Sequence, residues 1–166
     1  MKLVPVSAAN AQRCSLANEG PVVGENKRGL VYASIELINS DDLALQRRGY
    51  MSEDQVRRMT VETLVDSGAE SLAINETIKV QLGLQGIDTR AAQLADRTML
   101  QLEIVGPVDI RFANRSTTTR AMVLPGNVEP LLGAIPMEDM DVIIEPRQGR
   151  LIVNPEHPYM VQHSLK

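Results

Sequence analysis

The chain has 166 residues, of which 43% are hydrophobic and 23% charged, so it is long enough and apolar enough to fold around one core. Aromatic residues make up only 2%, so the core must be aliphatic, and the base stacking used by single-stranded nucleic-acid binders is disfavoured. The net charge of −4 leaves no basic footprint for nucleic acid or an anionic membrane, and we expect neither as a partner.

Residues 1–28 have the composition of a flexible leader, because Asn, Ser, Ala and Gly dominate and the apolar residues show no period. Cys14 lies in this leader and is the only cysteine, which excludes an internal disulfide and fits a reducing compartment. The N-terminal apolar stretch is broken by Pro5 and is too short for a secretory signal, and no apolar run approaches the length of a membrane span. We therefore expect a cytoplasmic protein whose one thiol is unreactive.

Short strands are predicted along the chain by apolar runs that lie between turn-forming residues. The first run alternates from Leu30 to Ile38 and has one strongly apolar face. Turn sequences at 114–116 and 146–149 join pairs of strands and predict two hairpins. The expected strands span 30–38 and 60–65, two strands within 94–104 around a polar tip at 96–97, then 108–112, 118–124, 142–144 and 151–153.

Brief helices are predicted where a capping residue or proline precedes a short apolar pattern, or a glycine follows it. They are a piece over 43–48 before Gly49, a turn at the Ser52–Gln55 capping box, a helix between Asn75 and Gly83, and a helix over 137–140 after Pro136. Because the βαβ rhythm of a parallel sheet is missing, the fold class is all-β, a small barrel or sandwich over residues 29–154. The final hairpin either lies in the main sheet or forms a subunit interface, and residues 155–166 form an irregular tail.

The segment Thr63-Leu64-Val65-Asp66-Ser67-Gly68-Ala69 carries the clearest chemical signal. An acid at the end of an apolar strand is unusual, because burying an isolated carboxylate is costly. Ser67 adds a hydroxyl, and Gly68 lets the chain turn sharply and present backbone N–H donors. The alternative is an ordinary surface turn, since Asp, Ser and Gly are common turn formers.

This segment resembles the active-site motif of the retropepsin-like (retroviral-type, clan AA) aspartic proteases, which reads two apolar residues, Asp, Thr or Ser, Gly and Ala. That family has a second motif of two apolar residues and Gly before a short helix, and Leu131-Leu132-Gly133 occupies this place here. The stretches 129–133 and 146–151 resemble the bacterial branch of the family. The resemblance covers roughly residues 30–153 and implies a small closed or partly open β-barrel with one or two short helices.

The resemblance implies an aspartic endopeptidase that cleaves peptide or protein substrates with a water activated between two carboxylates, without a metal or cofactor. Asp-Ser-Gly occurs once in the chain, so the two carboxylates would be Asp66 of each protomer in a homodimer. Ser67, Gly68 and Ala69 would support the site, with Ser67 forming a hydrogen bond across the dimer.

Glu70 and the tip of a flap hairpin at Ala95-Asp96-Arg97 are the substrate-binding positions that the resemblance implies. This tip lacks the Gly-rich sequence of viral relatives, and Ala134 stands where viral enzymes place an Arg, so the dimer contacts must differ. These departures leave open a catalytically silent binding or scaffolding domain on the same fold. An unrelated β-module, in which Asp66 only forms a turn, is the other alternative.

Other polar clusters carry weaker signals. His157 and His163 lie in the Pro-containing tail, where we interpret them as polar tail residues rather than metal ligands. A Ser or Cys triad is disfavoured because no His lies within the part expected to fold. We interpret Asp41-Asp42 and Glu53-Asp54 as a solvated loop rather than a cation site, and Arg57-Arg58 as a solvated face of the same segment.

Overall fold

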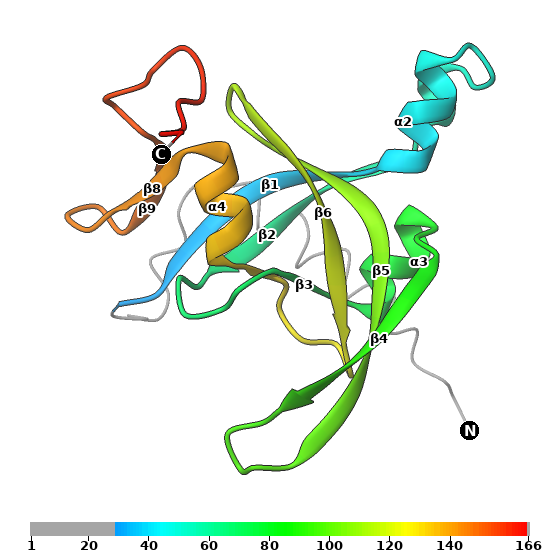
Figure 1. Ribbon diagram of the computed structural model, residues 1–166, viewed down its shortest axis with the longest axis horizontal. Coiled ribbons are helices and arrows are strands. Elements are labelled where there is room, and N and C mark those ends of the chain that lie inside the picture. The colour runs from blue at the N-terminus through cyan, green and yellow to red at the C-terminus, as the bar shows by residue number, and fades with distance from the viewer. Residues whose placement is uncertain (1–28, 166) are drawn as a thin grey trace, which may run out of the picture.

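The computed structural model describes residues 29–165, and most of its regular structure is β-strand, as the sequence predicts (Figure 1). The strands are β1 (Val31–Asn39), β2 (Arg58–Val65), β3 (Leu72–Asn75), β4 (Gly86–Gln93), β5 (Met99–Phe112), β6 (Arg115–Leu124), β7 (Leu131–Leu132), β8 (Val142–Glu145) and β9 (Arg150–Val153). They form one sheet in the order β4-β5-β6-β3-β7-β2-β1-β9-β8. Because β1 also pairs with β5, the strands from β5 round to β1 close into a ring. The expected leader, with Cys14, lies outside the described residues.

Residues 29–165 also contain three short α-helices, one more than the resemblance implies: α2 (Ser40–Arg47), α3 (Glu76–Leu82) and α4 (Ala134–Met140). A 3₁₀ turn, η1 (Glu53–Gln55), follows α2. Helix α2 begins earlier than predicted because the side chain of Asn39 accepts the N–H of Asp42 and caps its first turn. The predicted ends of α3 are confirmed: Asn75 accepts the N–H of Ile78, and Gly83 adopts the left-handed conformation with φ of 61°. None of the helices described is long and apolar enough to cross a membrane.

The β5–β6 and β8–β9 hairpins lie where their turn sequences predict them. The β4–β5 hairpin differs from its prediction, because its first strand lies before residue 94 rather than after it. Strand β4 is exposed at nearly every position, so its extended conformation comes from pairing with β5 and not from an apolar face. A strand of this kind has no periodic apolar signal in the sequence.

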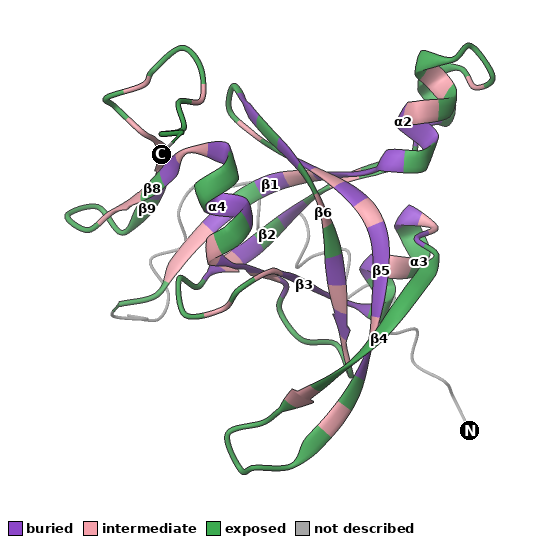
Figure 2. Ribbon diagram, viewed as in Figure 1, coloured by how far each residue is buried: buried purple, intermediate pink, exposed green. Residues whose placement is uncertain are grey.

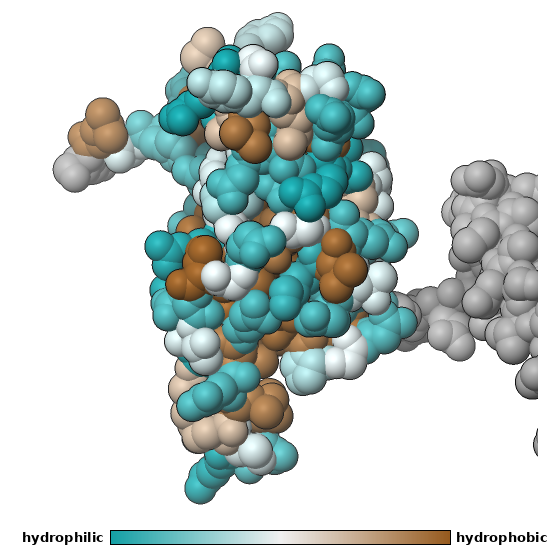
Figure 3. Space-filling model, turned by 90° about the vertical axis from the view of Figure 1, so that its right-hand side faces the viewer, coloured by the Kyte–Doolittle hydropathy of each residue, from teal (hydrophilic) through white to brown (hydrophobic). Residues whose placement is uncertain are grey.

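The core is aliphatic, as the composition requires, and it is built by the strands of the ring (Figure 2). Its completely buried side chains include Ile35, Leu37, Leu72, Ile74, Val108, Ile110 and Leu132. A second, small group of buried side chains lies beneath α2 and consists of Ile38, Leu43 and Val56. Strand β4 and the tip of the β4–β5 hairpin are largely exposed, whereas most of β5 is buried or half-buried (Figure 2), and the face that carries the hairpin together with α3 is mostly hydrophilic (Figure 3).

The segment between β1 and β2 is closed at its base by an ion pair. Arg57 donates to the two carboxylate oxygens of Asp42 from Nε at 2.8 Å and Nη2 at 2.9 Å, and its backbone N–H donates to the same carboxylate at 3.0 Å. The side chain of Asp42 is only 3% exposed, and the hydrogen bonds from Arg57 lower its pKa below the usual range. The expectation that Asp42 belongs to a solvated loop is therefore wrong, because its carboxylate is buried and needs a partner, whereas Arg57 is half exposed, as expected, and supplies that partner.

The tail from Asn154 contains neither helix nor strand, as predicted, but it is tied to the end of α4. Asp141 accepts hydrogen bonds from Nδ2 of Asn154 at 2.9 Å and from the N–H of Gln162 at 3.3 Å, and its Oδ2 lies 2.6 Å from Nδ1 of His157. The bond from Asn154, followed by that from His157, lowers the pKa of Asp141 from 3.8 to about 2. His157 is thus the partner of a carboxylate and not simply a polar residue of a loose tail.

We expect Asp141→Asn to release this tail, because a neutral amide binds Asn154 and His157 less strongly than a carboxylate does. Hydrogen exchange of residues 154–162, followed by mass spectrometry at neutral pH, should become faster. Glu156→Gln, at an exposed position of the same tail, is the matched control and should leave the exchange unchanged.

The same contact makes the tail sensitive to acid. Folding lowers the pKa of Asp141, so the ionised carboxylate stabilises the tail fully well above pH 3.8. This stabilisation is lost as the pH falls from 3.8 towards about 2. In the substitution test described above, equal hydrogen exchange of residues 154–162 in Asp141→Asn and in the wild type at neutral pH would contradict the role given to Asp141.

Candidate active site

Asp66 lies at the end of β2, where the parallel strand β7 holds its backbone in place. The N–H of Leu64 donates to the carbonyl of Pro130 at 2.9 Å, and the N–H of Asp66 donates to the carbonyl of Leu132 at 3.0 Å. The two sequence motifs, one around Asp66 and the other at Leu131-Leu132-Gly133, are therefore neighbours in the fold although they are far apart in the chain.

The carboxylate of Asp66 is exposed and is oriented by its own turn. Oδ1 of Asp66 accepts the N–H of Gly68 at 2.9 Å, and its carbonyl accepts the N–H of Ala69 at 3.1 Å. Oδ2 has no hydrogen-bond partner within residues 29–165, and Ser67 is exposed beside it. An ordinary Asp-Ser-Gly turn forms the same bond to Gly68, so this turn alone does not distinguish an active site from a structural turn.

The loop that follows Asp66 crosses the start of α4 at Gly133. The carbonyl of Ala69 accepts the N–H of Ala134 at 2.8 Å, and that of Glu70 accepts the N–H of Ile135 at 2.9 Å. A Cβ atom on Gly133 would lie 2.5 Å from the carbonyl oxygen of Ser71 and 2.6 Å from its nitrogen, closer than real Cβ contacts. Only glycine fits here, so the second motif positions the loop of the first.

Two open hollows meet at Ser67. One has a volume of about 340 Å³ and is lined by residues 29–31, the end of β2 and Ile144, and the other has about 250 Å³ and is lined by α4 and β8. The first hollow, which Asp66 lines, is polar and apolar in nearly equal measure, whereas the second is largely apolar. Leu30 in the first and Ile143 in the second are exposed by 48% and 41%, and no other part of residues 29–165 covers them.

The substrate-binding positions that the resemblance implies are exposed, and only Glu70 lies close to Asp66 in the fold. Ala95-Asp96-Arg97 form the tip of the β4–β5 hairpin, where Asp96 accepts the N–H of Thr98 at 2.9 Å; this bond lowers the pKa of Asp96. The side chain of Glu70 is exposed beside the crossing. No hydrogen bond or ion pair within the described part of the chain joins these side chains to Asp66.

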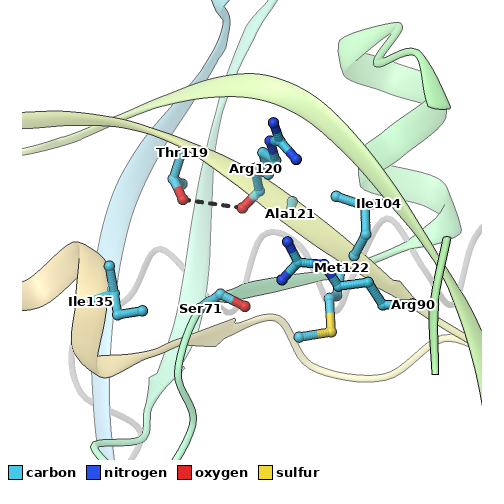
Figure 4. A pocket seen from close by; sticks show the side chains of 8 residues that line it. All are labelled: Ser71, Arg90, Ile104, Thr119, Arg120, Ala121, Met122 and Ile135. Carbon is cyan, nitrogen blue, oxygen red and sulfur yellow. Dashed lines mark hydrogen bonds between the residues drawn. The ribbon is translucent and has the colours of Figure 1, made fainter. Parts of the chain in front are cut away.

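A third hollow, of about 170 Å³, lies between the β4–β5 hairpin, β6 and α4 (Figure 4). It is lined by Ser71, Arg90, Ile104, Thr119, Arg120, Ala121, Met122 and Ile135. Neither Arg90 nor Arg120 stands out in the sequence, because each is a single charge in a largely polar stretch. Arg90 on β4 and Arg120 on β6 come together only because both strands pair with β5, and nothing in the neighbouring sequence predicts this pairing.

Within residues 29–165, no group of three or more His, Cys, Asp or Glu side chains is arranged to hold a metal ion. His157 faces Asp141, and Nε2 of His163 lies 4.0 Å from Oδ1 of Asp139. The described histidines therefore each face one carboxylate of the segment around α4.

No protein-family model matches the chain, and no curated protein matches its sequence. A functional conclusion must consequently come from the geometry around Asp66 and from the two motifs.

We expect Gly133→Ala to destabilise the protein by roughly 1–3 kcal/mol, because the new methyl group meets backbone atoms that cannot move without breaking the crossing. Gly86→Ala is the matched control: its Cβ would meet only Oε1 of the flexible Glu103 side chain at 2.5 Å. Urea unfolding followed by circular dichroism measures both variants. Equal midpoints for the two would contradict the role given to Gly133.

Proposed function

We propose that the chain is an aspartic endopeptidase of the retropepsin type, in which two copies face each other and each supplies Asp66 to one shared site. The observation that carries the proposal is the placement of Asp66, an exposed carboxylate at the end of a strand, in an open hollow of mixed polar and apolar lining that meets a second, largely apolar hollow at Ser67. The backbone on both sides of it is fixed by residues 130–135. A simple surface turn does not need so much support from a distant segment.

The order of the elements supports the same assignment. An acid-bearing turn after β2 is followed by β3, the helix α3, the hairpin of β4 and β5, the strand β6, the Leu131–Leu132 strand β7 and, after Gly133, the short helix α4. Apart from α3, this is the order that the resemblance implies, and the closed ring of strands is compatible with the barrel of that family. The hairpin of β4 and β5 takes the place of the flap.

A second copy is required because the chemistry needs two carboxylates and the motif occurs once. The apolar surface beside Asp66 supports this, since a symmetric partner would cover Leu30 and Ile143 and bring its own Asp66 to the axis. Burial of these side chains would stabilise the dimer at the same place where the second acid is needed.

Two carboxylates about 3 Å apart repel each other by roughly 5 kcal/mol at an effective dielectric constant of 20, so the pair shares one proton over an acidic range. The ionised carboxylate takes a proton from a bound water while the water oxygen attacks the carbonyl carbon of the peptide bond. The protonated carboxyl group donates its proton to the carbonyl oxygen. The tetrahedral intermediate then collapses: one of its hydroxyl groups returns a proton to the ionised carboxylate, and the C–N bond breaks as the leaving nitrogen takes the proton of the other carboxyl group.

We expect Asp66→Asn to abolish cleavage of an unstructured protein substrate, with a loss of roughly 10³-fold or more, because the amide can neither take nor supply the proton. Circular dichroism should show an unchanged fold. Asp54→Asn, at an exposed position on η1, is the control and should keep full activity.

Mixtures of wild type and Asp66→Asn test whether the site is shared. At constant total concentration, the activity should fall as the square of the wild-type fraction, because mixed dimers hold only one acid. A linear fall would mean that each chain acts alone. Wild-type protein that binds peptides but cleaves none would favour the silent scaffolding alternative instead.

The dependence of kcat/KM on pH is expected to be bell-shaped and centred on the acidic side, because cleavage needs one protonated and one ionised carboxyl group. Initial rates with a fluorogenic peptide between pH 3 and 8 measure it. A rate that continued to rise above neutrality would contradict the two-carboxylate mechanism.

A further inference from the structure

The hollow between β4, β6 and α4 has a size and a lining that suit one amino-acid side chain. Its volume is about 170 Å³, which is too small for a large ligand. Four apolar residues form much of its wall, and two arginines, Arg90 and Arg120, lie at its sides. The apolar members are Ile104, Ala121, Met122 and Ile135.

Strand register explains why both arginines reach this place. Ile104 of β5 is paired with Met122 of β6 and with Asp88 of β4, and residues paired in this way point to the same face of the sheet. Arg90 is two residues from Asp88, and Arg120 is two residues from Met122, so both share that face. Figure 4 shows the Arg90 side chain reaching from β4 into the hollow and Arg120 on β6 beside it.

The positive charge in this hollow is poorly balanced by the protein itself. Arg90 has one acidic neighbour, since its Nε lies 3.9 Å from Oδ2 of Asp88, and both side chains are about half exposed, so the pair is weak. Arg120 forms no ion pair with any described residue, and no carboxylate lines the hollow. Guanidinium groups bind carboxylates through paired N–H···O bonds, which an acidic side chain entering here would complete.

The hollow adjoins the loop that carries the acid. Ser71, which lines it, ends the loop that begins at Asp66, and Ile135, which also lines it, donates its N–H to the carbonyl of Glu70. An extended peptide with its scissile bond at Asp66 advances by about 3.3 Å per residue and would pass this opening within a few residues.

We infer that Arg90 and Arg120 form a specificity pocket for an acidic side chain, Glu or Asp, near the scissile bond of a peptide substrate; this rests on the proposed function. The apolar wall packs against the methylene groups of the side chain, and the two guanidinium groups bind its carboxylate. A Lys or Arg side chain is rejected because it would bring a third positive charge into the same small space.

Binding to the Asp66→Asn variant tests the pocket separately from catalysis. Fluorescein-labelled nonapeptides that carry Glu, Gln or Lys at one position, moved along the peptide, are titrated by fluorescence anisotropy. At one position the Glu peptide should bind about tenfold more tightly than the Gln peptide, and the Lys peptide more weakly than both.

Charge reversal tests the assignment to these residues. The double reversal Arg90→Glu/Arg120→Glu, placed in the Asp66→Asn chain, should make the Lys peptide bind more tightly than the Glu peptide, and Arg90→Gln should weaken the preference for Glu because one guanidinium group remains. Arg111→Glu, an exposed reversal on β5 outside the hollow, is the matched control and should keep the preference for Glu. Circular dichroism checks that each variant folds.

The outcomes separate the pocket from the peptidase. Equal binding of the three peptides at every position, or no binding of any peptide, overturns the pocket, whether or not the wild type cleaves proteins. A preference for Glu that the double reversal Arg90→Glu/Arg120→Glu reverses supports the pocket, even if the wild type cleaves nothing and the endopeptidase proposal fails. A preference that all variants retain assigns acid recognition to other residues and overturns the inference.

Discussion

The hydrogen bonds that residues 64–70 exchange with residues 130–135 determine where Asp66 lies. They join two segments whose own backbone groups would otherwise lack partners: carbonyls of a loop without a strand neighbour, and N–H groups in the first turn of a helix. Each segment thus satisfies the other. Because the contact is made by backbone atoms, most side chains there are free to vary, and the close approach restricts only Gly133.

Charge and apolar surface are distributed unevenly around this crossing. The protein as a whole is acidic, with a net charge of −4. The hollow between β4, β6 and α4, however, is lined by two arginines and by no acidic residue. Near Asp66, Leu30 and Ile143 expose apolar side chains in the two hollows that meet at Ser67. In the proposed function, the scissile bond and the second copy both have to reach Asp66, so they would share the surface around the acid, and only the arginine-lined hollow lies apart from it.

Features set by neighbouring residues could be predicted from the sequence. Asn75 and Gly83 at the ends of α3, the turn at 146–149, and the position of Asp66 at the end of a strand all depend on local conformational preferences. Other features depend on contacts that the local sequence does not reveal. They are the parallel pairing of β2 with β7, the strand conformation of β4, which has no apolar pattern, and the ion pair of the buried Asp42 with Arg57. The hollow lined by Arg90 and Arg120 could not be predicted for the same reason, because the two arginines come together only when their strands pair in the sheet.

The segment between β1 and β2 begins and ends at one point, since the N–H of Asn39 donates to the carbonyl of Arg57 at 2.9 Å and Asp42 bonds the same arginine. These contacts at the ends of the segment hold β1 and β2 in register with each other. The segment between β1 and β2 can therefore be lengthened, shortened or replaced, even by a foreign module, while the end of β2 that carries Asp66 stays where it is.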